Sequence, residues 1–299
     1  MKILLCNDDG IDAAGIEAMH DALIDHGGHF GAPFADVVLP IAPYTVQSAT
    51  GHGITFRQPL ITKEVPVNDR MVGIAVDGRP ADCVKLGLAT LWPAKFGKRA
   101  RPDLVISGMN QGANIGINVL YSGTCAAALE AAFLGVPAIA VSVHIGRGRP
   151  RYDVAARHAR AAIEALIGRP SAKELRKLLP PHTCLSINVP ATEREGKTPP
   201  IRICPMNTHG LVDAYTKNRN PLGETYYWSG GSPMDFHGTA PGSDVQELFA
   251  GNITVTPLKY DLSDFQAIAN WRTRLGQGAS GTASGRSRGS RASATGPAR

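Results

Sequence analysis

Short apolar runs alternate with segments of helical periodicity from the start of the chain to about residue 190. Ahead of the Gly27–Gly28 pair, Ile16, Met19 and Leu23 recur at helical spacing, which is typical of a helix packed on a sheet. The predicted strands are residues 2–6, 36–42, 72–76, 104–106, 138–143 and 185–189, and the other predicted helices are 80–91, 124–134 and 154–167.

This order of strand and helix favours parallel strands joined by helical crossovers that cover both faces of a sheet. We therefore expect an α/β fold with a Rossmann-like, doubly wound, mostly parallel sheet. Sheets of this class bind ligands at the carboxyl ends of their strands, near the point where the strand order reverses.

The pattern changes after about residue 190. Residues 201–206, 225–228 and 253–258 resemble strands of a hairpin-rich region, separated by loops rich in Gly, Pro and Asn. This region could be a small second subdomain or an oligomerisation arm. The predicted organisation is a core of residues 1–190, a strand-rich region of residues 191–275 that closes the domain, and a disordered Gly/Ser/Arg tail of residues 276–299.

The composition supplies enough apolar material for a large core, with 43% hydrophobic and 19% charged residues among 299. The formal net charge is +6. Four arginines without any acid lie in the tail, so charge does not indicate a nucleic-acid-binding body. The tail is either a solvated extension or a contact for RNA or an acidic partner.

The five cysteines are far apart, and no two have C-x-x-C spacing. This usage is typical of small core residues in a reducing compartment. The first apolar run, residues 3–6, is too short for a signal-peptide core, and no run reaches the length of a membrane helix. We expect a cytoplasmic protein without a membrane segment.

Two adjacent carboxylates follow the first predicted strand, in the sequence Asn7-Asp8-Asp9-Gly10. Neighbouring acids repel each other, and a bound cation relieves that repulsion. Hard oxygen ligands favour Mg²⁺ or Mn²⁺ over zinc. The alternative is an ordinary turn in which Asp9 or Asp12 caps the next helix.

Three more polar segments follow predicted strands. Residues 107–116 are rich in Gly and Asn and suit close approach to an anion, although they lack the lysine of a P-loop. Residues 121–124 place hydroxyls at a helix start, which is either an anion site or simple capping. Residues 47–52 place Ser48 and His52 after the second strand, where a lone histidine is often only a surface residue.

These loops converge at one rim of a parallel sheet, so together they predict a cation held by oxygens beside an anion pocket. Phosphate chemistry is the natural interpretation of that combination.

Several motifs resemble the SurE family of 5′-nucleotidases (survival protein E), and the resemblance covers roughly residues 1–262. The motifs are N-D-D-G-I-x-A-x-G-I at 7–16, A-P at 42–43, Q-S-A-T-G-H at 47–52, P-A-D-C-V-K at 80–85, P-D-L-V-I-S-G-M-N-Q-G-A-N-I-G at 102–116, Y-S-G-T-x-A-A-A-L-E at 121–130, G-S-D-V at 242–245 and I-T-V-T-P-L at 253–258.

The resemblance implies a metal-dependent phosphatase that acts on nucleoside 5′-monophosphates and forms a homodimer or homotetramer. It also implies one divalent cation, Mg²⁺ or Mn²⁺, per subunit, and extension of the activity to 3′-nucleotides or short polyphosphate in some members. C-terminal segments of the family tend to exchange between subunits. The implied metal ligands are Asp8, Asp9, Ser48 and Asn110, and the implied phosphate-site residues are Gly10, Ser107, Gly108, Asn110, Ser122, Gly123 and Thr124.

Two departures from the family pattern lie near this site. Ala14 replaces the usual proline of the first loop, and Ile117-Asn118 replaces acids that often follow the A-N-x-G stretch. The second change lies at the pocket mouth and bears on substrate preference.

Asp8 and Asp9 are the predicted catalytic residues. We favour attack by a metal-activated water, with one of these carboxylates accepting its proton, over direct attack by Asp8. The alternatives are a polyphosphate or sugar-phosphate phosphatase using the same site, and a nucleotide-binding sensor without hydrolytic activity.

Overall fold

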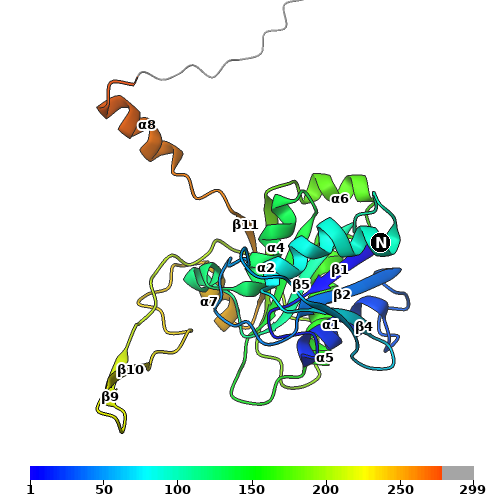
Figure 1. The fold of residues 1–299 in the computed structure, drawn as a ribbon, viewed down its shortest axis with the longest axis horizontal. Coiled ribbons are helices and arrows are strands. Elements are labelled where there is room, and N and C mark those ends of the chain that lie inside the picture. The colour runs from blue at the N-terminus through cyan, green and yellow to red at the C-terminus, as the bar shows by residue number, and fades with distance from the viewer. Residues whose placement is uncertain (278–299) are drawn as a thin grey trace, which may run out of the picture. The chain divides into compact units, whose positions relative to one another are not determined.

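The computed structural model describes residues 1–277, and most of the strands form one nine-stranded sheet (Figure 1). The strand order is β3-β4-β2-β1-β5-β6-β7-β11-β8. Neighbouring strands from β4 to β7 are parallel, whereas β3 and β11 are antiparallel to their neighbours β4 and β7. The strands are β1 Lys2–Cys6, β2 Val37–Pro43, β3 Thr62–Pro66, β4 Val72–Val76, β5 Leu104–Gln111, β6 Ala138–Val143, β7 Thr183–Val189, β8 Ile201–Ile203 and β11 Ile253–Lys259.

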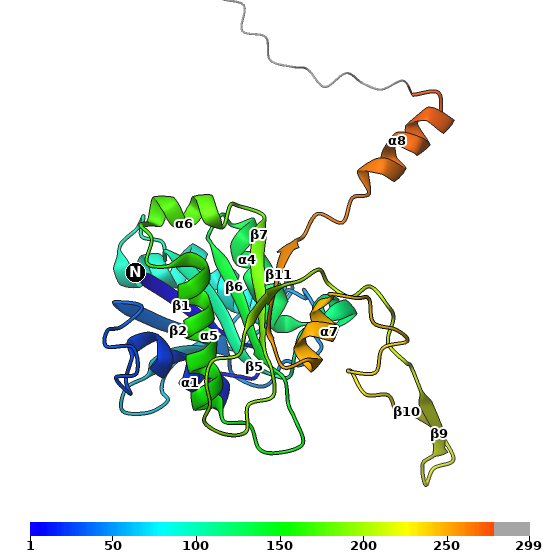
Figure 2. The same ribbon diagram turned by 180° about the vertical axis from the view of Figure 1, so that it is seen from behind.

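Helices cover both faces of the sheet, as Figures 1 and 2 show from opposite sides. Side chains along β1 point alternately to the two faces of the sheet. Ile3 and Leu5 therefore pack into the apolar cluster on one face, and Leu4 and Cys6 pack into the cluster on the other. Helices α1 and α5 contribute to the first cluster, and α2 and α4 to the second. The helices of this part of the chain are α1 Ala14–Ile24, α2 Pro80–Leu86, α3 Trp92–Phe96, α4 Gly123–Phe133, α5 Tyr152–Ile167, α6 Ala172–Leu178 and α7 Asp244–Phe249.

The strand order reverses between β1 and β5. From β1 the chain builds outward through β2 and β4 on one side and then through β5, β6 and β7 on the other. The crevice outside the carboxyl ends of β1 and β5 is therefore the switch point at which this class of sheet binds ligands. The predicted doubly wound, mostly parallel sheet is confirmed.

Several elements differ from the sequence prediction. Strand β5 continues to Gln111, because the segment after Ile106 stays paired with β6 across a register shift between Ser107 and Asn110. The predicted helix 80–91 is α2 followed directly by a π-helical turn, Gly87–Leu91.

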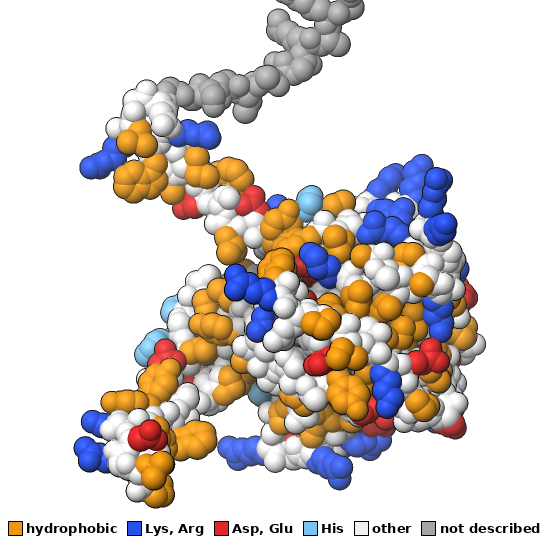
Figure 3. Space-filling model, viewed as in Figure 1, with side chains coloured by type: hydrophobic (Ala, Val, Ile, Leu, Met, Phe, Trp, Pro, Cys, Tyr) orange, Lys and Arg blue, Asp and Glu red, His pale blue; other side chains and the backbone are white. Residues whose placement is uncertain are grey.

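The C-terminal strands divide between the main sheet and one separate hairpin. Strand β11 pairs antiparallel with β7 inside the main sheet, and β8 pairs parallel with β11, so the sheet continues past residue 190. One separate antiparallel hairpin is formed by β9 Tyr215–Arg219 and β10 Thr225–Ser229. Figure 3 shows apolar side chains along this hairpin, and Tyr215, Tyr227 and Trp228 are exposed.

The chain divides into two compact units, Met1–Tyr260 and Asp261–Arg299. In the second unit the structure describes α8, Phe265–Arg274, which has no buried residues. The predicted tail of residues 276–299 lies outside the described residues from residue 278 onward. All five cysteines are free and buried. Within residues 1–277, no helix combines the length and the apolar character needed to cross a bilayer.

Candidate active site

Asp8 lies at the carboxyl end of β1, at the switch point, and its side chain is buried. Its Oδ1 accepts a 2.5 Å hydrogen bond from the Thr124 hydroxyl, and its Oδ2 accepts one of 3.2 Å from the Thr124 N–H. The pKa of Asp8 is raised from 3.8 to about 6, mainly by burial and also by the negative charge of Asp9, against the opposing effect of the Thr124 bonds. The site therefore holds a carboxylate whose ionised form lacks a compensating charge.

Asp9 points toward β5. Its Oδ2 accepts a 2.8 Å hydrogen bond from the Gln111 N–H, and burial raises its pKa as well. The turn that follows is closed by the Asn7 amide, which donates to the Gly10 carbonyl at 2.9 Å. Gly10 has a φ of +104°, a backbone conformation that side-chain-bearing residues rarely adopt.

The irregular end of β5 brings three more predicted residues to the same edge. Gly108 has a φ of +142°, and a Cβ there would lie 2.2 Å from the Val141 carbonyl oxygen, so glycine is required. The Asn110 amide nitrogen donates to the Gly112 carbonyl at 2.6 Å. This bond does not involve the Asn110 Oδ1. The Ser107 hydroxyl is buried and has no hydrogen-bond partner among residues 1–277. Because a buried polar atom ordinarily has a hydrogen-bond partner, this unpaired hydroxyl indicates that a ligand binds at this edge of the sheet.

The start of α4 supplies the remaining predicted residues. The Ser122 hydroxyl accepts a 3.0 Å hydrogen bond from the Cys125 N–H and so caps the helix. Thr124 directs both its hydroxyl and its N–H to Asp8. A Cβ on Gly123 would lie 3.0 Å from the Asp8 Cβ, so this close approach of helix to strand favours a glycine. In this first turn the Thr124 N–H donates to Asp8 and the Cys125 N–H donates to Ser122, whereas the Gly123 N–H donates to neither residue.

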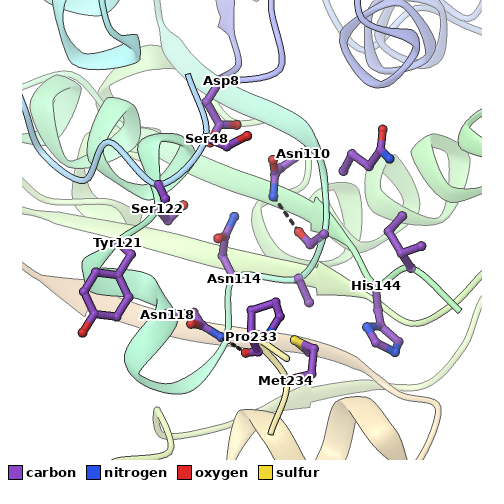
Figure 4. Close-up of a pocket in the computed structure, with 15 residues that line it drawn as sticks. Asp8, Ser48, Asn110, Asn114, Asn118, Tyr121, Ser122, His144, Pro233 and Met234 are labelled. Atoms are coloured by element: carbon purple, nitrogen blue, oxygen red, sulfur yellow. Dashed lines mark hydrogen bonds between the residues drawn. The ribbon is translucent and has the colours of Figure 1, made fainter. Parts of the chain in front are cut away.

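A cavity of about 460 Å³ opens beside these residues (Figure 4). Four predicted site residues line it: Asp8, Ser48, Asn110 and Ser122. Asp9, Gly10, Ser107, Gly108, Gly123 and Thr124 are not among its lining residues. The other side chains labelled in Figure 4, which the sequence analysis did not assign to the site, are Asn114, Asn118, Tyr121, His144, Pro233 and Met234.

The cavity has two chemically distinct ends. Figure 4 places Asp8, Ser48 and Asn110 together at one end, and Pro233 and Met234 at the other. The Asn118 amide donates a hydrogen bond to the Pro233 carbonyl and so ties the two walls of the mouth together. The segment around residue 233 does not follow a strand of the main sheet, so the sequence offered no reason to place it at the cavity. Only Asn118, which departs from the family pattern, indicated this end of the cavity.

The oxygen donors at the first end match a hard divalent cation. Asp8 and Asp9 provide carboxylates with raised pKa values, and Ser48 and Asn110 provide neutral oxygens nearby. Among residues 1–277, no group of three or more His, Cys, Asp or Glu side chains could hold a metal, so the neutral donors are needed to complete such a site.

Comparison with known proteins extends over most of the chain. The family model described as survival protein SurE matches residues 3–211. The 5′-nucleotidase SurE of Solidesulfovibrio magneticus is 41% identical over 277 residues, which are 92% of this chain and 98% of that protein. The 5′-nucleotidase SurE of Desulforudis audaxviator is 39% identical over 269 residues, 90% of this chain and 95% of that protein.

The fold agrees with these sequence matches. The crystal structure of the SurE protein from Aquifex aeolicus superposes with a TM-score of 0.72 and 29% identity, covering 92% of this chain and all of that one. The predicted family is confirmed, and its curated relatives carry the name of the predicted enzyme class. This chain belongs to the survival protein SurE family.

Proposed function

We propose that this chain hydrolyses nucleoside 5′-monophosphates to nucleoside and phosphate. The observation that carries the proposal is the pair Asp8 and Asp9 at the switch point, with Asp8 buried, raised in pKa and open to a cavity of nucleotide size. The relatives named 5′-nucleotidase SurE supply the substrate class.

The proposal includes one divalent cation, Mg²⁺ or Mn²⁺, per subunit, held by Asp8, Asp9, Ser48 and Asn110. The raised pKa values of the two adjacent carboxylates, whose negative charges a cation would neutralise, support this assignment. When bound, such a cation neutralises charge on the phosphoryl group and lowers the pKa of a coordinated water.

The protein groups then have separate tasks. The Ser107 hydroxyl, the backbone of Gly108 and the free N–H of Gly123 bind phosphate oxygens, and one of the two carboxylates accepts the proton of the attacking water. Both oxygens of Asp8 already accept hydrogen bonds from Thr124. This favours a water nucleophile over direct attack by Asp8.

The assembly and the wider substrate range belong to the same proposal. The exposed aromatic side chains of the β9–β10 hairpin favour burial against another subunit in a homodimer or homotetramer. Activity on 3′-nucleotides and short polyphosphate, and a cytoplasmic location, follow from the family resemblance.

Replacement of Asp8 tests the proposal. We expect Asp8→Asn to lower phosphate release from a nucleoside 5′-monophosphate at least about 100-fold at saturating Mn²⁺. Asp12→Asn is the matched control, because Asp12 is exposed in the following turn. Near-normal turnover by Asp8→Asn would contradict the assigned role.

A further inference from the structure

Ser48 lies in the loop of residues 44–55, which follows β2 and is here called the Ser48 loop. No residue of this loop is buried, so apolar packing alone does not fix its position. Near Ser48, the Gln47 N–H donates to the Asp8 carbonyl at 2.8 Å, and the Gly51 N–H donates to the Tyr121 carbonyl at 3.0 Å. The loop therefore depends on polar contacts at its edges.

A further contact is made by Glu130, a buried acid on α4. Its Oε2 accepts a 2.9 Å hydrogen bond from His52 Nε2, and its Oε1 accepts one of 3.0 Å from Lys85 Nζ. Burial by itself would raise the pKa of Glu130, but the bonds from His52 and Lys85 outweigh it and hold the pKa below its ordinary value. Glu130 is thus an ionised carboxylate whose two oxygens bind different elements.

The orientation of His52 is fixed by aromatic packing. Its ring stacks on Phe133, one turn further along α4, with centroids 5.1 Å apart and planes inclined by 6°. Phe133 in turn contacts Tyr260 edge to face, with ring centroids 4.1 Å apart. The imidazole therefore presents Nε2 to Glu130 in one defined direction.

A second buried acid holds the far end of the loop. Asp82, on α2, accepts hydrogen bonds from the Thr55 N–H at 2.9 Å and from the Thr55 hydroxyl at 2.7 Å. None of Asp82, Lys85 and Glu130 is among the residues predicted from the sequence for the site. In the structure Asp82 contacts the Ser48 loop at Thr55 and Glu130 contacts it at His52, while Lys85 binds Glu130.

We propose that Glu130 is a positioning residue of the active site, which acts through His52 to hold the Ser48 loop where Ser48 faces Asp8. The predicted effect on cation binding rests on the proposed function. The restraint of the Ser48 loop by Glu130 and His52 does not, because it follows from their contacts alone. Lys85 binds the same carboxylate without touching the loop, so it provides a matched control.

The restraint is tested first in the metal-free protein by hydrogen–deuterium exchange. In His52→Ala and Glu130→Gln, we expect amides of residues 44–55 to exchange at least about fivefold faster than in the wild type. Lys85→Met should leave their exchange unchanged. Unchanged exchange in both His52→Ala and Glu130→Gln, or an equal increase in Lys85→Met, would overturn the proposal.

The consequence is tested by calorimetric titration of the same metal-free proteins with Mn²⁺ alone. We expect His52→Ala and Glu130→Gln to bind Mn²⁺ at least about tenfold more weakly, as is typical when a residue supporting a metal ligand is lost. His52→Gln, whose amide can still donate to Glu130, should restore affinity to within about twofold. Lys85→Met should bind like the wild type.

The outcomes separate the two proposals. Wild-type Mn²⁺ affinity in His52→Ala despite a loosened loop would overturn the link between Glu130 and the cation. Failure of the wild-type protein itself to bind Mn²⁺ and to release phosphate would instead contradict the proposed function. A melting temperature of His52→Ala close to that of the wild type shows that weaker binding does not reflect general unfolding.

Discussion

Asp8 and Thr124 are 116 residues apart in the chain and share a 2.5 Å hydrogen bond at the carboxyl end of β1. The bond joins the first strand of the sheet to the first turn of α4, and the Thr124 N–H adds a second contact to the same carboxylate. Thr124 therefore stabilises the ionised form of Asp8 rather than standing free to bind phosphate.

Replacement of Thr124 by valine should weaken cation binding in mildly acidic solution. Loss of the hydroxyl removes a bond that lowers the pKa of Asp8, so the pKa should rise above 6. Protons then compete more strongly with the cation. We expect Mn²⁺ affinity at pH 6.5 to fall about threefold for a rise of about one pKa unit, measured by calorimetry. Thr124→Ser keeps the hydroxyl and should bind normally; equal loss in both variants would contradict this explanation.

The contribution of Asp8 to the stability of the metal-free protein should decrease as the pH rises from about 4 to 7. The pKa of Asp8 is 3.8 in its ordinary state and about 6 in the fold, so the folded protein binds this proton more tightly than the unfolded chain. Above pH 6 the ionised carboxylate costs on the order of 3 kcal/mol.

Asp8→Asn isolates that contribution. The variant should be more stable than the wild type at pH 7.5 without metal and should lose most of this advantage at pH 4, as measured by denaturant unfolding. Added Mn²⁺ should stabilise the wild type but not the variant. A destabilised Asp8→Asn protein at pH 7.5 would show that the buried charge is compensated in some other way.

Gly15 lets α1 approach the site-bearing strand closely. A Cβ at this position would lie 2.0 Å from the Met109 carbonyl oxygen, so Gly15→Ala must displace either the helix or β5. We expect the melting temperature to fall by about 5 °C. Ala14→Ser, at the exposed first position of α1, should change it by less than about 1 °C. An unchanged melting temperature for Gly15→Ala would show that α1 does not pack as described.

Asn118 should control access to the cavity. Its amide binds the Pro233 carbonyl across the mouth, so Asn118→Ala releases that wall without touching Asp8 or Ser48. We expect KM for nucleoside monophosphates to rise severalfold with kcat little changed. Asn118→Asp, which cannot donate to a carbonyl, should behave like the alanine variant. A loss confined to kcat would place Asn118 in the reaction itself.

The sequence predicted the end of the cavity that holds Asp8, Ser48 and Asn110, because each of these residues lies at or just beyond the carboxyl end of a strand. Asp8 follows β1, and parallel strands bring such positions to one edge whatever the length of the crossovers. The opposite end was not predicted, because Pro233 and Met234 reach the cavity through the path of a loop, and no periodicity encodes that path.

The same distinction holds for the fold. The apolar run of β11 predicted a strand but not its partner, and pairing with β7 in the main sheet depends on contacts across about 70 residues. The edge strand β3 was missed, since its mostly exposed residues show no buried alternation. Helix α8 was missed for a related reason, because none of its residues is buried.

The central claim is tested most directly by phosphate release from a panel of nucleoside 5′- and 3′-monophosphates in the presence of EDTA, Mg²⁺ or Mn²⁺. The account predicts release that requires a divalent cation, is abolished by EDTA and favours the 5′-monophosphates. Absence of release from the folded protein with either cation, or equal release in EDTA, would contradict it.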